Sequence, residues 1–307
     1  MQPKITFLGT GGDSFLIGKQ IRASGGIIVQ AGDHQLHLDP GPGTLVRAAE
    51  YGINLRENTA VLVSSPSILK CNDINAVLDA MSYGGMDING VLLAASQLVN
   101  GTDNESGFLK KKHSKYVERV LAVRPEQRIG IENVEVRVLK TSAENNVGFK
   151  VFTPDFVFSY SSATSYEKSI AEQYHKSDIL VLDVQLPQEE TAENCLSRHD
   201  ATRIVNLVKP RLTVLTGFSK RMLEADPLYE AREVQKATGC QVVAANDGMV
   251  INPVSYSASM KQKTLNLYPH KGPEAGHEPV TFTEIEPEEP EPAEEQKPQD
   301  KQSTLGQ

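Results

Sequence analysis

Residues Ala60–Met81, with the sequence AVLVSSPSILKCNDINAVLDAM, decide how the rest of this chain is interpreted. The run of β-branched and aliphatic residues at 60–63 predicts a buried strand. Residues 64–70 contain a proline among serines and predict a tight turn. From Asp73 to Met81 the apolar residues recur at helical spacing, which predicts an amphipathic helix. The stretch therefore indicates a strand–turn–helix unit at the centre of an α/β protein.

The composition is that of a globular protein with a charged end. The chain has 307 residues, of which 39% are hydrophobic, and this is enough for one large core or two small ones. The formal net charge is −8, and residues 256–307 hold ten acidic residues and five lysines, so that the rest is close to neutral. This balance gives no electrostatic argument for nucleic acid as the main partner, which leaves nucleic-acid binding unsupported.

The cysteines and the apolar runs indicate the compartment. Cys71, Cys195 and Cys240 are widely spaced and odd in number, which fits reduced thiols better than a disulfide framework. The chain shows neither a signal-peptide pattern nor an apolar run long enough to span a bilayer. We therefore expect a soluble, cytoplasmic protein with no membrane partner.

Other short runs of β-branched residues between turn residues predict further strands. These strands are expected at 4–8, 24–29, 35–38, 91–95, 129–131, 134–139, 147–152, 157–160, 179–183, 212–216, 242–245 and 249–251. Helices are expected at 44–51, 166–174, from Ser197 or Asp200 to 208, 219–223 and 230–237. Residues 97–107 are polar and predict a loop, and the basic residues at 110–119 predict a solvated face. This order indicates two packed sheets with helices outside.

Two turns carry residues of interest. Residues 9–12, Gly-Thr-Gly-Gly, follow the first strand and form either a tight turn or the floor of a cleft. They are not a phosphate-binding loop, because the lysine and hydroxyl residue of that motif do not follow. Asp39 ends a strand beside the rigid turn Pro-Gly-Pro-Gly, where an aspartate commonly caps the next segment.

With these elements placed, the chain resembles the stand-alone prokaryotic, chiefly archaeal, metallo-β-lactamase-fold hydrolases near the RNase Z-like branch, which processes tRNA 3′ ends. The resemblance covers about residues 4–253, and the order and spacing of its segments are more specific than any one of them. The segments are ITFLGTGG (5–12), HLDPGPG (37–43), VLVSSPS (61–67), NDINAVLDAM (72–81), FSYSSATSYE (158–167), KSDILVLDV (176–184), VKPRLTVLTGFSKRML (208–223) and AANDGMVI (244–251). The resemblance implies an αββα sandwich with a site at the sheet edges, where the family uses zinc to activate a hydroxide.

This chain departs from the family at the positions of the metal ligands. In the family's first motif, T-H-x-H-x-D-H, serines replace two histidines, leucine replaces the aspartate and lysine replaces the last histidine. The degenerate positions are Ser65, Ser67, Leu69, Lys70, Thr141, Ala163 and Gly217, with Cys195 at a further family histidine. Hydroxyls bind transition metals weakly, and the charge of Lys70 opposes a cation. The resemblance therefore implies no bound cofactor and no catalytic residue, with Asp39 and Asp247 retained as supporting residues.

Several alternatives stay open. A relocated metal or thiol site would use Cys71, Cys195 and His199, with Asp73 as a further candidate, although free cysteines are usually buried apolar residues. Ser65 and Lys70 could form a Ser–Lys hydrolytic pair. The simpler interpretation is a filled pocket with Lys70 reaching solvent.

The C-terminal part has its own pattern. We expect a metallo-β-lactamase-like domain at 1–255 and a disordered, acidic, Pro/Glu-rich tail at 256–307. Within the tail, Gln262, Leu265 and Tyr268 resemble a sliding-clamp-binding peptide, although the usual second aromatic residue is Pro269. A similar start, Gln-Ser-Thr-Leu, recurs at 302–305.

The sequence thus leads to three hypotheses. The first is a catalytically inactive pseudo-hydrolase, a binding, scaffold or regulatory subunit with a protein partner such as an active relative. The second is a metal-dependent or Ser/Lys hydrolase of phosphodiesters or esters with a relocated site. The third is a replication or repair accessory linked to a sliding clamp through its tail.

Overall fold

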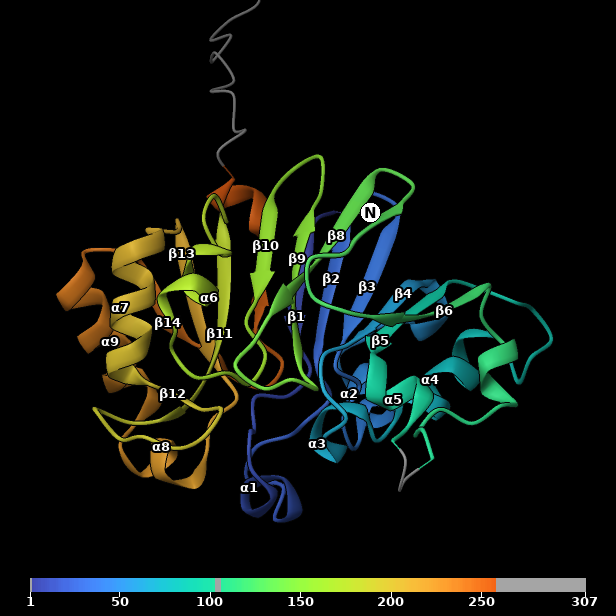
Figure 1. The fold of residues 1–307 in the computed structure, drawn as a ribbon, viewed down its shortest axis with the longest axis horizontal. Helices are drawn as coiled ribbons and strands as arrows, with labels where there is room; N and C mark the ends of the chain where they lie inside the picture. Colours follow the sequence, from blue (N-terminus) through green and yellow to red (C-terminus); the bar gives the residue numbers. More distant parts are fainter. Residues whose placement is uncertain (1, 103–105, 258–307) are drawn as a thin grey trace, which may run out of the picture. The chain divides into compact units, whose positions relative to one another are not determined.

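The computed structural model describes residues 2–102 and 106–257 (Figure 1). The predicted clamp peptide of Gln262, Leu265 and Tyr268, and all of the predicted disordered tail except Tyr256 and Ser257, lie outside these residues. The predicted domain boundary at residue 255 stays a prediction. None of the described helices has the length and apolar composition that a bilayer crossing requires.

The first sheet contains the strand of the central unit. Its strand order is β15-β1-β2-β3-β4-β5-β6. The strands are β1 (Lys4–Phe7), β2 (Ile27–Ala31), β3 (His34–Leu38), β4 (Asn58–Val63), β5 (Val91–Ala95), β6 (Arg119–Val123) and β15 (Val250–Ile251). Strands β3 to β6 run parallel to one another, whereas β1 pairs antiparallel with β2 and β15.

The second sheet combines an antiparallel meander with a parallel part. Its order is β14-β13-β11-β10-β9-β8-β7, and β12 pairs with β11. The strands are β7 (Arg128–Ile131), β8 (Val134–Lys140), β9 (Val147–Phe152), β10 (Val157–Tyr160), β11 (Ile179–Leu186), β12 (Leu196–Ser197), β13 (Leu212–Thr216) and β14 (Val242–Ala244). Strands β10, β11, β13 and β14 are parallel.

Most helices cover the outer faces of the two sheets, whereas α1 (Ser14–Gly18) lies beyond the strand ends, at the bottom of Figure 1. The α-helices are α1 (Ser14–Gly18), α2 (Thr44–Glu50), α3 (Ile68–Cys71), α4 (Ile74–Met81), α5 (Ser96–Asn100), α6 (Lys168–Glu172), α7 (Arg198–Val208), α8 (Lys220–Glu224) and α9 (Pro227–Thr238). The short 3-10 helices are Leu55–Glu57, His113–Lys115 and Pro253–Tyr256. Residues of α3 and α4 pack on the outside of the first sheet, and residues of α6, α7 and α9 pack on the outside of the second.

The core confirms the predicted αββα sandwich. Apolar side chains from both sheets, such as Leu62 and Phe149, form one buried cluster between them. The central stretch has the predicted order, because β4 is followed by a turn, by α3 and by α4, whose Ile74, Val77, Leu78 and Met81 are fully buried.

Several elements differ from the sequence-based prediction. Helices α1 and α3 and strand β12 were not predicted, and most of α3 lies in residues that were predicted to form a turn. Residues 97–107 were predicted to form a loop, but α5 begins at Ser96. Leu98 is the one buried residue of α5, so this part of the sequence shows no apolar periodicity. Strand β6 was not predicted, because its apolar run follows directly on the basic residues that were assigned to a solvated face.

The parallel strands bring their carboxyl ends to one edge of each sheet, where irregular backbone carries polar residues. Asp39 follows β3 and Ser64 follows β4 in the first sheet. In the second sheet, Tyr160 ends β10, Asp183 lies in the second half of β11, and Gly217 follows β13. These residues meet at the candidate site.

Candidate functional site

The ammonium group of Lys70 lies between two carboxylates that come from different sheets. Its Nζ atom donates hydrogen bonds to Asp183 Oδ2 at 2.6 Å and to the Tyr160 hydroxyl at 2.6 Å. It is 3.5 Å from Asp39 Oδ2. The Lys70 side chain is 15% exposed, and those of Asp39 and Asp183 are 6% and 2% exposed. The expectation that Lys70 reaches solvent is therefore wrong, because two buried carboxylates hold its charged end inside the protein.

A chain of hydroxyl groups completes the surroundings of Asp39. The Tyr160 hydroxyl donates to Asp39 Oδ2 at 2.8 Å. The Ser64 backbone N–H donates to Oδ1 and the Ser64 hydroxyl donates to Oδ2, each at 2.7 Å. Ser64 Oγ is also 2.7 Å from Ser162 Oγ. The polar groups around Lys70 are therefore bonded to one another, which is how buried charges are usually stabilised.

These contacts determine the protonation states. Burial alone would lower the pKa of Lys70, but the nearby Asp183, Tyr160 and Asp39 raise this pKa well above its ordinary value. Burial and the Asp39 carboxylate raise the pKa of Tyr160 well above its usual range. Lys70 is therefore a cation and Tyr160 a neutral phenol at neutral pH. Neither is poised to act as a general base, because a base must be unprotonated near the working pH.

A small cavity adjoins these residues, and we call it the lysine cavity. It has a volume of about 170 Å³. Gly9, Gly11 and Gly12 line it, which agrees with the interpretation of their turn as the floor of a cleft. The backbone there approaches closely, since a Cβ atom on Gly12 would lie 2.0 Å from the Gly217 carbonyl oxygen. Asp247 fixes the same loop by accepting hydrogen bonds from the backbone of Thr10 and Ala23.

Most of the residues at the degenerate positions come together at this cavity. Its lining includes Ser65, Ser67, Leu69, Lys70, Ala163 and Gly217, beside Asp39, Tyr160 and Asp183. Thr141 lies elsewhere, against a second cavity, where its hydroxyl donates to backbone carbonyls of its own loop. The Ser65 hydroxyl accepts from the Ser67 N–H, and Lys70 bonds to Tyr160 and Asp183 instead of Ser65.

The residues considered for a relocated site do not form a cluster. Cys71 is buried under the first sheet and its thiol donates to the Pro66 carbonyl. Cys195 donates to Gln185 Oε1, and His199 lies on α7 with half of its side chain exposed. Burial raises the pKa of Cys71 to about 12, and burial together with Asp183 raises that of Cys195. Both cysteines are thus thiols at neutral pH, whereas a nucleophile or a metal ligand must be a thiolate.

A metal ion does not fit these side chains. In residues 2–102 and 106–257, no group of three or more His, Cys, Asp and Glu side chains is placed to hold a metal. Asp39 and Asp183 are the acidic residues at the lysine cavity, and the Lys70 ammonium already lies between them. A metal ion there would have to displace an internal cation.

Asp183 and Tyr160 were missed by sequence reasoning as site residues. Asp183 appeared only as the end of a buried strand, and Tyr160 as the end of another. One signal was available, since Asp183 is an acidic residue within the apolar run ILVLDV of a buried strand, and buried carboxylates are rare unless paired. The sequence could not show that its partner is Lys70, because the two are 113 positions apart.

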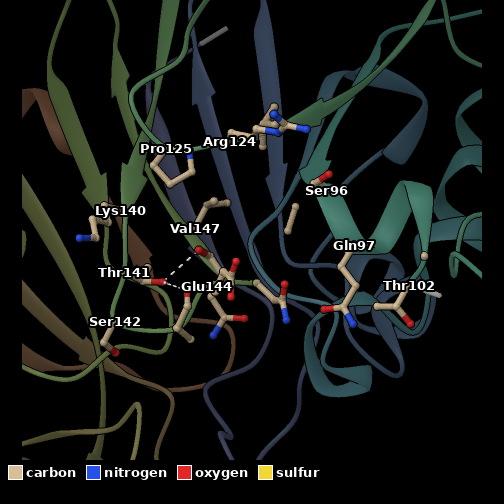
Figure 2. A pocket seen from close by; sticks show the side chains of 16 residues that line it. Ser96, Gln97, Thr102, Arg124, Pro125, Lys140, Thr141, Ser142, Glu144 and Val147 are labelled. Carbon is tan, nitrogen blue, oxygen red and sulfur yellow. Dashed lines mark hydrogen bonds between the residues drawn. The ribbon is translucent and has the colours of Figure 1, made fainter. Parts of the chain in front are cut away.

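A second cavity, which we call the outer cavity, lies at the carboxyl ends of β5 and β6 and beside the loop that joins β8 to β9 (Figure 2). Its volume is about 650 Å³. Figure 2 shows Arg124 and Pro125 on one side, Gln97 and Thr102 on another, and Glu144 between them and Thr141. Asn146 lines both cavities, so the 141–147 loop separates them.

Several known proteins are similar to this chain in sequence or in structure. No protein-family model matches the chain. The uncharacterized protein MJ1374 of Methanocaldococcus jannaschii is 25% identical over 255 residues, which cover 82% of this chain and 95% of that protein. The metallo-β-lactamase fold protein YhfI of Bacillus subtilis has a TM-score of 0.67 at 18% identity and matches 82% of this chain and 99% of its own. Human tRNase Z, short form, has a TM-score of 0.53 at 14% identity over 81% and 98% of the two chains.

The protein therefore has the metallo-β-lactamase fold. Its structural neighbours include an RNase Z, as the sequence resemblance led us to expect. The assignment to the archaeal branch and the cytoplasmic location stay predictions.

Proposed function

We propose that this protein is a hydrolytically inactive metallo-β-lactamase-fold protein that acts by binding, as a scaffold or regulatory subunit, and uses no metal. One observation carries the proposal: the Lys70 ammonium lies 2.6 Å from Asp183 and 3.5 Å from Asp39, between the acidic side chains of the cavity. The lysine supplies the positive charge that these carboxylates need. A metal ion would add positive charge at the same place and would be repelled by the ammonium.

The residues of the lysine cavity offer no substitute for metal-activated water. Lys70 is a cation and bonds to Tyr160 and Asp183 instead of Ser65, so it is not suited to be the base of a Ser–Lys pair. The network is instead suited to holding the edges of the two sheets together. The partner class we propose is another protein, either an active relative with the same fold or a sliding clamp, and the tail would supply the contact in the second case.

The first experiment measures metal content by plasma mass spectrometry on tag-free protein from zinc- and iron-supplemented cultures. We expect less than about a tenth of an equivalent of metal per chain, because stoichiometric metal would require displacement of Lys70. The same sample should not hydrolyse a phosphodiester such as bis(p-nitrophenyl) phosphate when zinc or manganese is added. About one or two metals per chain, or metal-dependent hydrolysis, would overturn the proposal.

A substitution of the lysine makes the proposal sharper. Lys70→Met leaves Asp39 and Asp183 buried without a cation, so we expect it to lower the free energy of unfolding by roughly 3–5 kcal/mol. Added Zn²⁺ or Mn²⁺ should then restore part of the loss, because an ion that binds only the folded state stabilises it. Urea unfolding with and without metal measures both effects.

The matched control is Lys111→Met, because Lys111 is exposed and its side chain bonds to no other residue in the described parts of the chain. It should leave both stability and metal response unchanged. If wild-type protein and Lys70→Met respond equally to metal, Lys70 does not exclude an ion. Lys70→Gln, which keeps a hydrogen-bond donor, replaces the methionine variant if the latter does not fold.

A further inference from the structure

Four polar side chains that line the outer cavity have no partner in the described parts of the chain. In residues 2–102 and 106–257, the side chains of Gln97, Arg124, Glu144 and Asn145 form no hydrogen bond or ion pair with another residue. Its volume of about 650 Å³ lies within the range of small-molecule binding sites, which is roughly 300–1,000 Å³. The cavity thus combines space for a ligand with free donors and acceptors.

The lysine cavity differs in both respects. It measures about 170 Å³, and its charged groups already have partners. Lys70 bonds to Asp183, and Asp39 accepts a hydrogen bond from Ser64. A ligand that bonded to these charged groups would have to replace their existing bonds, which costs free energy. The capacity to bind a ligand therefore lies in the outer cavity.

The charges and the lining of the outer cavity indicate the ligand class. Among the described lining residues, Arg124 and Lys140 contribute two positive charges against one negative charge from Glu144. An arginine without an internal carboxylate partner is suited to a phosphate group, which its planar fork can bind with two hydrogen bonds. Carboxamides such as Gln97 and Asn145 can donate to and accept from hydroxyl groups. Among the described lining residues there is no aromatic side chain on which a nucleobase could stack.

We propose that the outer cavity binds a small phosphorylated polyhydroxy compound, such as a sugar phosphate, with its phosphate group at Arg124. The position agrees with the rule that ligands of α/β proteins bind beyond the carboxyl ends of parallel strands, because β5 and β6 end at this cavity. This inference deepens the proposed function, since it names a ligand site for a protein that acts by binding.

The cavity is also connected to the lysine cavity. The backbone N–H of Val147, which lines the outer cavity, donates to the Ser64 carbonyl at 2.8 Å. The hydroxyl of Ser64 in turn bonds to Asp39 and lies against Ser162. A ligand that contacts the loop at 141–146 therefore lies next to the polar network that joins the two sheets. Binding in the outer cavity can change that network through the bond between Val147 and Ser64.

Calorimetric titration of the full chain with glucose 6-phosphate tests the proposal, with glucose and inorganic phosphate as partial ligands. We expect glucose 6-phosphate to bind more tightly than either part alone. Arg124→Met should weaken binding at least about tenfold, the loss expected for a hydrogen bond to a charged group. Arg128→Met is the matched control, because Arg128 is an exposed arginine outside the cavity, and its effect should stay within about twofold.

A third variant is expected to strengthen binding instead of weakening it. Glu144→Gln removes the negative charge of the cavity and should strengthen the binding of inorganic phosphate, whereas a nonspecific effect of mutation would weaken it. The proposal is overturned if neither glucose 6-phosphate nor ribose 5-phosphate binds at about 10 mM, which corresponds to less than roughly 3 kcal/mol of affinity. It is also overturned if Arg124→Met and Arg128→Met behave alike. Titration in EDTA separates this test from the metal measurement, because binding at the outer cavity should not depend on metal.

Discussion

Asp39 and Ser162 both lie in the left-handed backbone region, with φ of 52° and 55°. This region costs an L-residue roughly 1–2 kcal/mol, and aspartate tolerates it better than serine does. Ser64 joins the two residues, since its hydroxyl donates to Asp39 and lies 2.7 Å from Ser162 Oγ. The strained backbone thus places two polar side chains against a third, and residues in such conformations tend to cluster at functional sites.

Gly217 is one of the residues at this site that tolerate little change. Its φ is 69°, and a Cβ atom there would lie 2.0 Å from Asp183 Oδ1. We expect Gly217→Ala to lower the free energy of unfolding by about 2 kcal/mol more than the same substitution at an uncrowded left-handed glycine. The reason is that Asp183 must move away from Lys70 to make room for the Cβ atom. Urea unfolding measures the difference.

Gly239 is a matched control. It has the same φ of 69°, and no atom lies within 4 Å of its would-be Cβ. Gly239→Ala should therefore lower the free energy of unfolding only by the cost of a left-handed backbone at alanine, about 1 kcal/mol. Equal losses for the two variants would mean that the close approach of Gly217 to Asp183 is not present in solution.

At the scale of elements, helix ends fix the positions of the site residues. Asp73, which precedes α4, accepts hydrogen bonds from the backbone N–H groups of Gly43 and Thr44 at the start of α2. The Asp73 N–H donates to the Pro40 carbonyl. These bonds hold the turn after Asp39 against the helices that follow β4, and so they place Lys70 beside Asp39. Asp73, one of the candidates for a relocated site, therefore has a structural partner.

Helix α7 begins with a reciprocal cap. The sequence left open whether Ser197 or Asp200 caps this helix, and both do, because the Ser197 hydroxyl accepts from the Asp200 N–H and the Asp200 carboxylate accepts from the Ser197 N–H. We expect Ser197→Ala to destabilise the protein by about 1 kcal/mol, the usual cost of losing an N-cap serine. Thermal unfolding gives the comparison.

Ser67 offers a control of the same residue type in the same helix position. It is the N-cap residue of α3, but its side chain makes no capping hydrogen bond. Ser67→Ala should change the stability by less than about 0.5 kcal/mol, as is usual for substitutions away from such features. A loss at Ser197 no larger than the loss at Ser67 would contradict the capping-box assignment.

At the scale of the whole molecule, the polar cluster joins two sheets whose facing sides form a buried apolar cluster. Asp39 and Ser64 follow strands of the first sheet, whereas Tyr160 and Asp183 belong to strands of the second. Lys70 bonds across the interface between the sheets, at the edge of the buried apolar cluster that lies between them. The site therefore serves as a structural link as well as the lining of a cavity.

The fold was more predictable than the site. Local periodicity predicted β4 and α4, because a buried strand and an amphipathic helix leave a repeating pattern in the sequence. The resemblance predicted a site at the sheet edges, and most of the degenerate positions line one cavity there. It did not predict that Asp183 and Tyr160 would pair with Lys70, since pairing between residues 90 or more positions apart depends on how the sheets pack. The outer cavity has no sequence motif, because it is formed by loops from both sheets.

His37 makes the stability of the whole molecule depend on pH. Its side chain is fully buried on β3, where Nε2 lies 2.9 Å from the Gly25 carbonyl oxygen. Burial lowers its pKa from 6.5 to about 4, although the bond to Gly25 opposes the change. Between these values the unfolded chain binds a proton that the folded protein does not. Stability from this residue is complete above pH 6.5 and is lost as the pH falls toward 4, by about 3 kcal/mol in total.

The variant His37→Gln isolates this contribution, because glutamine can still donate to the Gly25 carbonyl but does not titrate. Between pH 7 and pH 4 its free energy of unfolding in urea should fall by about 3 kcal/mol less than that of the wild type. His199→Gln is the control for a histidine-to-glutamine change outside the core, since His199 is half exposed on α7. If His37→Gln follows the wild-type curve, His37 becomes protonated in the folded protein, and the interior of the first sheet opens to water more readily than its packing indicates.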